Sequence, residues 1–378
     1  MIQKCSSWRR IKNCQMFYSA ARQKAMLLAL LAIFHPAVAN GGDYRVGVFY
    51  FPGWKAGQLG NARDYPWEPI KNYPEREPLL GWYEEDAPGV MSTQLKWMRD
   101  YGVDYVVFDW FWGSTGRPHL SHGVNAYLTA EDRYGVDFAI MWANHTKYVF
   151  SASQFDELFR FWVQRYFFRS DYLRVSGKPA VFLFSADTFN KNAAQIGSNS
   201  AALIARAESI AREFGLPGVA FIGGVSANGR GFDYSAASGY AGFSAYNFHG
   251  MATRSYAPGR SMSHSYAELD RGYQDHWQWM AKNASGLYIV PMTSGWDKRA
   301  WGGSKDPMHD NSVSTQVEFG RHLQSAREFM NRNPERTQSM GVICCWNEFG
   351  EGSYIEPTKM HGFRYLEEVK RVFGAPQP

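Results

Sequence analysis

Glu348 and Glu351 are the residues whose type and spacing most directly suggest chemistry, because two carboxyl groups stand three positions apart in CCWNEFGEGSYIEPT (344–358). Glycines flank Glu351, so a loop can turn both side chains into one cleft. Trp346 and Phe349 would lower the local polarity and raise one carboxyl pKa, and the proximity of like charges would do the same. Glycoside cleavage uses such a pair of carboxyl groups with separated pKa values. The alternative is a loop whose acids face water.

Aromatic and polar side chains also gather where several strand-like runs end, and six of the 14 tryptophans belong to this group. The candidate substrate-binding residues are Tyr50, Trp54, Asp109, Trp110, Trp112, Trp142, Asn144, His145, Tyr246, Trp296, Asp297, Arg299, Trp346, Asn347 and Tyr354. Asn247 and His249 follow the same run as Tyr246. Glu356 precedes Pro357, and we interpret it as a capping or paired residue rather than a catalytic one.

This set of side chains is typical of a carbohydrate site. The C–H face of a sugar ring stacks on aromatic rings, and its hydroxyl groups need paired donors and acceptors in an apolar cleft. A nucleic-acid site would also use aromatic side chains but would need a basic groove. Neither a Walker pattern nor GxGxxG follows a strand-like run. His119 and His122 are spaced like zinc ligands but lack a third partner, so we expect no metal and no cofactor.

Eight short apolar runs, rich in β-branched and aromatic residues, provide the elements that would position these side chains. They span 45–51, 103–111, 136–143, 179–185, 218–225, 239–248, 286–293 and 340–346. Stretches with apolar positions three and four residues apart lie between them and predict helices. Eight strands alternating with helices predict a single (β/α)₈ TIM barrel over 40–378, with its chemistry at the carboxyl ends of the strands. The long aromatic-rich segment 52–90 after the first strand predicts a folded lid or subsite wall.

The first 39 residues differ from the rest of the chain. They carry six basic residues and no acid, then an apolar run at 25–34 and an Ala-x-Ala site at 37–39. This pattern predicts a secretory signal peptide over 1–39 and a periplasmic or secreted protein, the alternative being an uncleaved anchor. Its removal leaves 34 basic and 35 acidic residues, so no nucleic-acid partner is expected. No later run is long enough to span a membrane.

Cys344 and Cys345 are the cysteines left after removal of this leader. Neighbouring residues of a strand point to opposite faces, so we interpret the pair as two small buried side chains without a disulfide.

Several segments together resemble a known family. FYFPGW, VVFDWFW, MWANHT, SGWD-x-R and above all WNEFGEGSYIEP are similar to WbsX-like proteins and their relatives in glycoside hydrolase family 99. The resemblance implies a (β/α)₈ barrel related to retaining endo-acting α-mannosidases. It implies that Glu348 deprotonates the sugar 2-hydroxyl to give a 1,2-anhydro sugar, that Glu351 acts as general acid and then base, and that Asn347 helps to fix the site. The chain departs from the pattern at His145, where WbsX-like proteins often carry an acid, and at Gly350, where family 99 has a larger residue.

The sequence therefore predicts an exported retaining glycoside hydrolase that acts within a polysaccharide or oligosaccharide chain. A glycosyltransferase or transglycosylase of polysaccharide metabolism is the first alternative, since WbsX-like proteins also carry that description. A non-catalytic carbohydrate-binding barrel is the second, although it would not need both glutamates. The sequence leaves the oligomeric state open, and a monomer is compatible with it.

Overall fold

The computed structural model describes residues 44–59, 65–113, 115–145, 151–226, 232–248, 260 and 262–374. The predicted leader, 1–39, and His249 lie outside these residues. Within them, no helix has both the length and the apolar character needed to cross a membrane.

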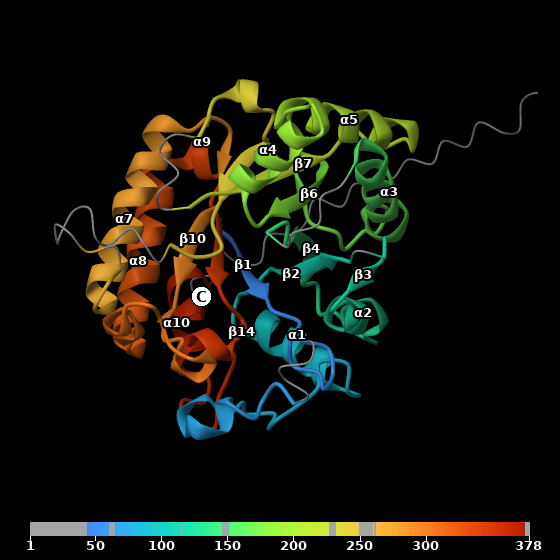
Figure 1. Cartoon of the computed structure of the whole chain (residues 1–378). Helices are drawn as coiled ribbons and strands as arrows, with labels where there is room; N and C mark the ends of the chain where they lie inside the picture. Colours follow the sequence, from blue (N-terminus) through green and yellow to red (C-terminus); the bar gives the residue numbers. More distant parts are fainter. Residues whose placement is uncertain are drawn as a thin grey trace, which may run out of the picture. The chain divides into compact units, whose positions relative to one another are not determined.

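Eight parallel strands form a closed barrel, which confirms the predicted fold (Figure 1). In order around the barrel they are β1 (Arg45–Tyr50), β2 (Tyr105–Trp112), β4 (Asp137–Trp142), β6 (Lys178–Leu183), β7 (Ala220–Gly224), β8 (Gly242–Ser244), the pair β9 (Leu287–Tyr288) and β10 (Val290–Thr293), and β13 (Met340–Cys344). The seventh strand is interrupted at Ile289, so that its first part pairs with β8 and its second part with β13. This split strand closes the ring.

The strands are apolar on both faces because side chains fill the barrel on one side and helices cover the other. All eight residues of β2 are buried, for example. The helices are α1 (Val90–Asp100), α2 (His122–Thr129), α3 (Ala152–Trp162), α4 (Ala186–Gln195), α5 (Ser200–Glu213), α7 (Tyr266–Asn283), α8 (Gln316–Arg332), α9 (Pro334–Thr337) and α10 (Arg364–Phe373). Ser151 and Thr315 begin α3 and α8 with capping boxes, in which the hydroxyl accepts a hydrogen bond from the third helical amide.

Short elements lie in the loops between the barrel strands and helices, most of them at the carboxyl end of the barrel. They are the strands β3 (Pro118–His119), β5 (Arg174–Val175), β11 (Gly295–Trp296), β12 (Ser312–Val313), β14 (Asn347–Glu348) and β15 (Ser353–Tyr354), and 3₁₀ turns such as Pro74–Arg76, Arg299–Trp301 and Phe349–Glu351. β5 is the exception, because it precedes β6 and pairs with its first residues. The remaining short strands follow barrel strands and shape the loops that carry the predicted site.

The described part of the segment 52–90 is folded against the loop after β13. Trp54 and Trp67 stack with ring centroids 3.9 Å apart, and Phe349 packs against both rings. These residues belong to a second apolar core, separate from the barrel core. The segment therefore supports the loop that carries Glu348 and Glu351.

The interpretation of the two cysteines is wrong. The structure joins Cys344 and Cys345 in a disulfide, and the peptide bond between them is cis. The expectation of opposed side chains assumed the trans peptide of a regular strand, whereas here β13 ends at Cys344.

Candidate active site

A cavity of about 430 Å³ lies at the carboxyl ends of the barrel strands. Each of the eight strands, or the loop that follows it, contributes at least one residue to its wall. The wall comprises Phe51, Asp109, Phe111, Ala143, His145, Phe184, Ser185, Ala186, Asp187, Gly224, Val225, Ser226, Phe232, Tyr234, Tyr246, Asn247, Trp301, Glu348 and Glu351. The cavity therefore occupies the position where barrel enzymes carry their chemistry.

The glutamate pair stands on a small hairpin after β13. β14 and β15 pair in antiparallel fashion, with Asn347 opposite Tyr354, and the 3₁₀ turn Phe349–Glu351 joins them. Gly352 ends this turn with φ of 64°, and a Cβ atom there would lie 2.9 Å from the backbone nitrogen of Asp297. Glycine is therefore required at this position, both for the backbone conformation and for the close approach.

Position 350 requires glycine for a different reason. A Cβ atom at this position would lie 2.0 Å from the ring of Trp301, which also lines the cavity. The missing side chain leaves room for the indole. A larger side chain at this position would displace Trp301 from its place in the cavity wall.

Glu348 is 4% exposed, and its Oε1 atom accepts a hydrogen bond of 2.8 Å from the Tyr246 hydroxyl. Its Oε2 atom is buried and has no hydrogen-bond partner among the described residues. Burial raises the pKa of Glu348 well above its usual value, and the nearby carboxyl groups of Glu351 and Asp109 act in the same direction. A buried carboxyl oxygen without a partner, on a residue that lines a cavity, is a candidate contact for a ligand.

Glu351 is partly buried, and this burial raises its pKa to about 7, against the opposing effect of the Lys298 ammonium group. Asp109 is 7% exposed and is a further carboxyl group of the cavity wall, which also includes Asp187. Burial raises its pKa well above the usual range; the Tyr246 hydroxyl opposes this, and Glu351 adds to it. Because burial and mutual repulsion disfavour the full ionisation of these carboxyl groups, the cluster retains a proton near neutral pH. A carboxyl group with a pKa of about 7 can both give and take a proton there.

Five of the predicted site residues line this cavity together, namely Asp109, His145, Tyr246, Glu348 and Glu351. His145 packs its ring against Phe184, with centroids 4.3 Å apart. Burial lowers the pKa of His145, so the side chain is neutral at neutral pH.

Other predicted residues support the cavity wall without lining the cavity. Asn347 accepts from the Phe51 amide at 2.8 Å and donates to the Phe51 carbonyl at 2.9 Å, so it fixes the end of β1. Asn144 makes the same two-way contact with the backbone of Ser185. Trp54 donates its indole N–H to the Asn347 carbonyl. These side chains position cavity residues rather than line the cavity.

The remaining predicted residues lie away from this cavity. Trp110 packs against Trp162 and Trp112, Trp142 packs against Trp162, and Trp346 is fully buried in the barrel core. Tyr50 donates to Gln94. Trp296 stacks near His309 and donates to Ser304. Asp297, Arg299 and Tyr354 line a second cavity of about 420 Å³.

Strand geometry explains most of this division. Side chains alternate along β2, so Asp109 and Phe111 face the cavity while Trp110 and Trp112 face the covering helices. The same alternation places Phe111 on the face of Asp109, so it could have identified Phe111, which was not among the residues selected from the sequence. Trp301 was missed because it follows the last residue considered in its loop, Arg299, by two positions.

The histidines at 119 and 122 are not brought together with a third ligand among the described residues, where no group of three metal-binding side chains converges. His122 contacts Glu85 through Nε2 at 2.8 Å.

Comparisons with known proteins place these features in context. We found no curated protein whose sequence matches this chain. A structure described as a glycoside hydrolase-like protein has a TM-score of 0.62 at 14% identity, covering 89% of this chain and 96% of the other. The GH99 endo-alpha-mannosidase from Bacteroides thetaiotaomicron has a TM-score of 0.61 at 18% identity, covering 87% and 96%. At these identities the similarity establishes the shared fold.

The sequence comparison covers more than three quarters of the chain. Residues 71–369 match the family described as Glycosyltransferase WbsX, and this stretch includes the hairpin with both glutamates and most of the cavity wall. The chain belongs to the WbsX family.

Proposed function

We propose that this chain is an exported, retaining glycoside hydrolase that cleaves a polysaccharide within its chain, with Glu348 and Glu351 as catalytic residues. The observation that carries the proposal is a cavity holding both carboxyl groups, in which burial raises the pKa of Glu351 to about 7 and that of Glu348 well above its usual value. The similar fold of an endo-alpha-mannosidase supports the substrate class. The signal-like segment 1–39 supports export.

In the first step of the proposed reaction, Glu348 takes the proton of the sugar 2-hydroxyl while the 2-oxygen forms a bond to C1. The glycosidic C1–O bond breaks, and Glu351 gives its proton to the leaving oxygen. In the second step Glu351 removes a proton from water, whose oxygen attacks C1. The bond from C1 to the 2-oxygen breaks, and Glu348 returns its proton to that oxygen. Both carboxyl groups end in their starting protonation states.

The reaction needs the negative charge on Glu348 and the proton on Glu351. Burial and the neighbouring carboxyl groups work against the charge on Glu348, since they raise its pKa well above the usual value, whereas the hydrogen bond donated by the Tyr246 hydroxyl favours its ionised form. A pKa near 7 matches Glu351 to a group that alternates between acid and base. Phe111, Phe184, Phe232 and Tyr234 provide aromatic faces on the cavity wall for sugar rings.

The family description favours one second candidate, a transglycosylase. It would use the same two carboxyl groups and the same first step, with a sugar hydroxyl in place of water in the second. A transferase that uses nucleotide sugars would have to work outside the compartment that supplies them, which the signal-like leader argues against.

The test is cleavage of a glycan panel by residues 40–378. The panel contains α-mannans and bacterial exopolysaccharides, and the readouts are reducing-end release and, by proton NMR, the anomer of the first product. Hydrolysis with retention that is lost in Glu348→Gln and in Glu351→Gln is the expected result. Longer oligosaccharides without new reducing ends would select the transglycosylase. Tight glycan binding without any reaction would contradict both and leave a binding barrel.

A further inference from the structure

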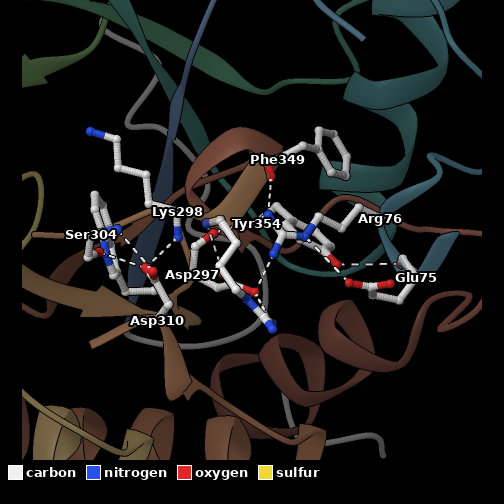
Figure 2. Close-up of polar contacts among 10 residues, drawn as sticks. Glu75, Arg76, Asp297, Lys298, Ser304, Asp310, Phe349 and Tyr354 are labelled. Carbon is white, nitrogen blue, oxygen red and sulfur yellow. Dashed lines mark hydrogen bonds and ion pairs between the residues drawn. The ribbon is translucent and has the colours of Figure 1, made fainter. Parts of the chain in front are cut away.

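Arg76 connects the segment after β1 to the back of the glutamate hairpin. It is 2% exposed and lies at the end of the 3₁₀ turn Pro74–Arg76. Its Nη1 atom donates to the Phe349 carbonyl at 2.9 Å and to the Asp297 carbonyl at 3.1 Å, and its Nη2 atom contacts the Asp297 carboxylate (Figure 2). One planar guanidinium group thus binds two loops that come from different barrel strands.

Asp297 completes the connection to Glu351. Its backbone N–H donates to the Glu351 carbonyl at 2.7 Å. Arg76 therefore holds the carbonyl at the start of the turn Phe349–Glu351, and its partner Asp297 holds the carbonyl at the end. The close approach of Gly352 to Asp297 leaves little space for the turn to move. Both ends of the backbone that carries Glu351 are therefore held by residues that do not line the cavity.

The charges in this contact are nearly balanced. Asp297 is buried, which raises its pKa, but its hydrogen bonds with Arg299 and the charge of Arg76 outweigh burial and hold the pKa of Asp297 below its usual value. Glu75 lies 3.6 Å from Arg76 Nε. Since the pKa of Asp297 is lowered while those of Asp109, Glu348 and Glu351 are raised, Asp297 is ionised at lower pH than these cavity carboxyl groups.

We propose that Arg76 is a positioning residue, which sets the place of the Glu351 carboxyl group in the cavity through the Phe349 carbonyl and through Asp297. This inference rests on the proposed function of Glu351. It gives the segment 52–90 a role in the reaction that does not require contact with the sugar. Since a displacement of about 1 Å can lower a catalysed rate about 100-fold, loss of this hold should act on the chemical step.

The principal test is the Arg76→Met variant of residues 40–378 on a glycan that the wild type cleaves. We expect kcat to fall between about 10-fold and 100-fold while KM stays near the wild-type value, because the cavity wall keeps its residues. Arg45→Met is the matched control: it removes the ion pair with Asp137, 2.7 Å long, where β1 and β4 begin at the other end of the barrel. The control should lose stability without this fall in kcat. An unchanged kcat in Arg76→Met, or a change confined to KM, would overturn the inference.

Arg76→Lys separates the charge from the two-point contact. Lysine keeps the positive charge but lacks the planar fork that reaches both Phe349 and Asp297 at once. We expect kcat to recover only in part, and full recovery would overturn the two-point hold. The same variant carries the test if Arg76→Met does not fold.

Hydrogen exchange at the Asp297 amide keeps this test separate from the proposed function. We expect the exchange rate to rise in the Arg76 variants while the amides of β2 stay at their wild-type rates. If the wild type cleaves no glycan, the proposed function fails. A faster exchange of the Asp297 amide in the Arg76 variants would still support the contact of Arg76 with Asp297. Unchanged exchange at Asp297 would contradict the hold whatever the activity.

Discussion

Two groups of buried carboxyl side chains lie close to the loop after β13, and they differ in how their oxygen atoms are satisfied. In the first group, Glu85 accepts from the Trp54 amide and contacts His122, each at 2.8 Å. Glu356 accepts from the Tyr83 hydroxyl at 2.7 Å and from Gln94 at 3.1 Å. All four oxygen atoms of this support pair, Glu85 and Glu356, have a partner. Glu356 is thus a paired residue.

The second group consists of three of the cavity carboxyl groups, the buried Asp109 and Glu348 and the partly buried Glu351, and its hydrogen bonds are incomplete. Asp109 Oδ1 and Glu348 Oε2 have no hydrogen-bond partner within the described part of the chain. Leaving a buried polar atom unpaired costs about 1–3 kcal/mol, so a fold retains it where a ligand can use it. The comparison distinguishes carboxyl groups that stabilise the fold from carboxyl groups whose oxygen atoms remain available to a substrate.

The largest expected effect is on the rate in the Glu351→Gln variant. Because the amide neither gives nor accepts a proton in the reaction, kcat should fall by about 1,000-fold, within the usual range for a general acid–base residue. Circular dichroism and a thermal scan should show a folded protein. A kcat near the wild-type value in a folded variant would remove Glu351 from the mechanism.

Glu356→Leu should show the opposite behaviour. The substitution leaves the Tyr83 hydroxyl and the Gln94 amide unpaired in the core, so the free energy of unfolding should fall by about 2–4 kcal/mol. Urea unfolding monitored by tryptophan fluorescence measures this loss. The rate per folded molecule should stay near that of the wild type, and a rate loss like that of Glu351→Gln would erase the distinction between the two groups.

The pH dependence of stability sharpens the comparison within the cavity. Burial raises the pKa of Glu351 to about 7, so this group favours the folded state most below the unfolded value of 4.5, and the contribution is lost as the pH rises towards 7. The Glu351→Gln variant cannot ionise at this position and therefore does not show this loss of stability at high pH. We expect the variant to melt at a higher temperature than the wild type at pH 8 and to lose the advantage at pH 4. Equal shifts at both pH values would show that the effect is not due to ionisation.

The smallest effect is expected at an exposed carboxyl group. Glu213 pairs with Arg160 at 2.7 Å, but the two side chains are 52% and 41% exposed. Glu213→Gln should change the free energy of unfolding by less than about 1 kcal/mol and leave the rate unaltered. A large effect here would mean that the loss of a surface charge, and not the environment of the carboxyl group, controls the outcome.

The fold was predictable from the sequence because its signals are local. Each barrel strand is a short run such as 45–51, and the capping and glycine positions between runs mark the helices. The glutamates were found because both stand in one short motif at the end of a strand. Trp110 and Trp112 were selected by composition, whereas the alternation of β2 turns them away from the cavity.

The rest depended on contacts between distant segments. Arg76 stands in the unremarkable stretch YPEREP, and only the folded chain brings it to Phe349 and Asp297, more than 200 residues away. The disulfide between Cys344 and Cys345 likewise could not be read from strand periodicity, because the backbone leaves the strand at that point. No pattern in the sequence encodes either feature.

One measurement tests the central claim most directly: the rate of glycan cleavage per folded molecule for the wild type, Glu348→Gln, Glu351→Gln and Glu356→Leu on the same responsive glycan. The account predicts that the first two variants lose the reaction while remaining folded, and that Glu356→Leu retains it while unfolding at lower urea concentration. Cleavage that survives in Glu348→Gln or Glu351→Gln, or that is lost in folded Glu356→Leu, would contradict the assignment of the open carboxyl groups to catalysis.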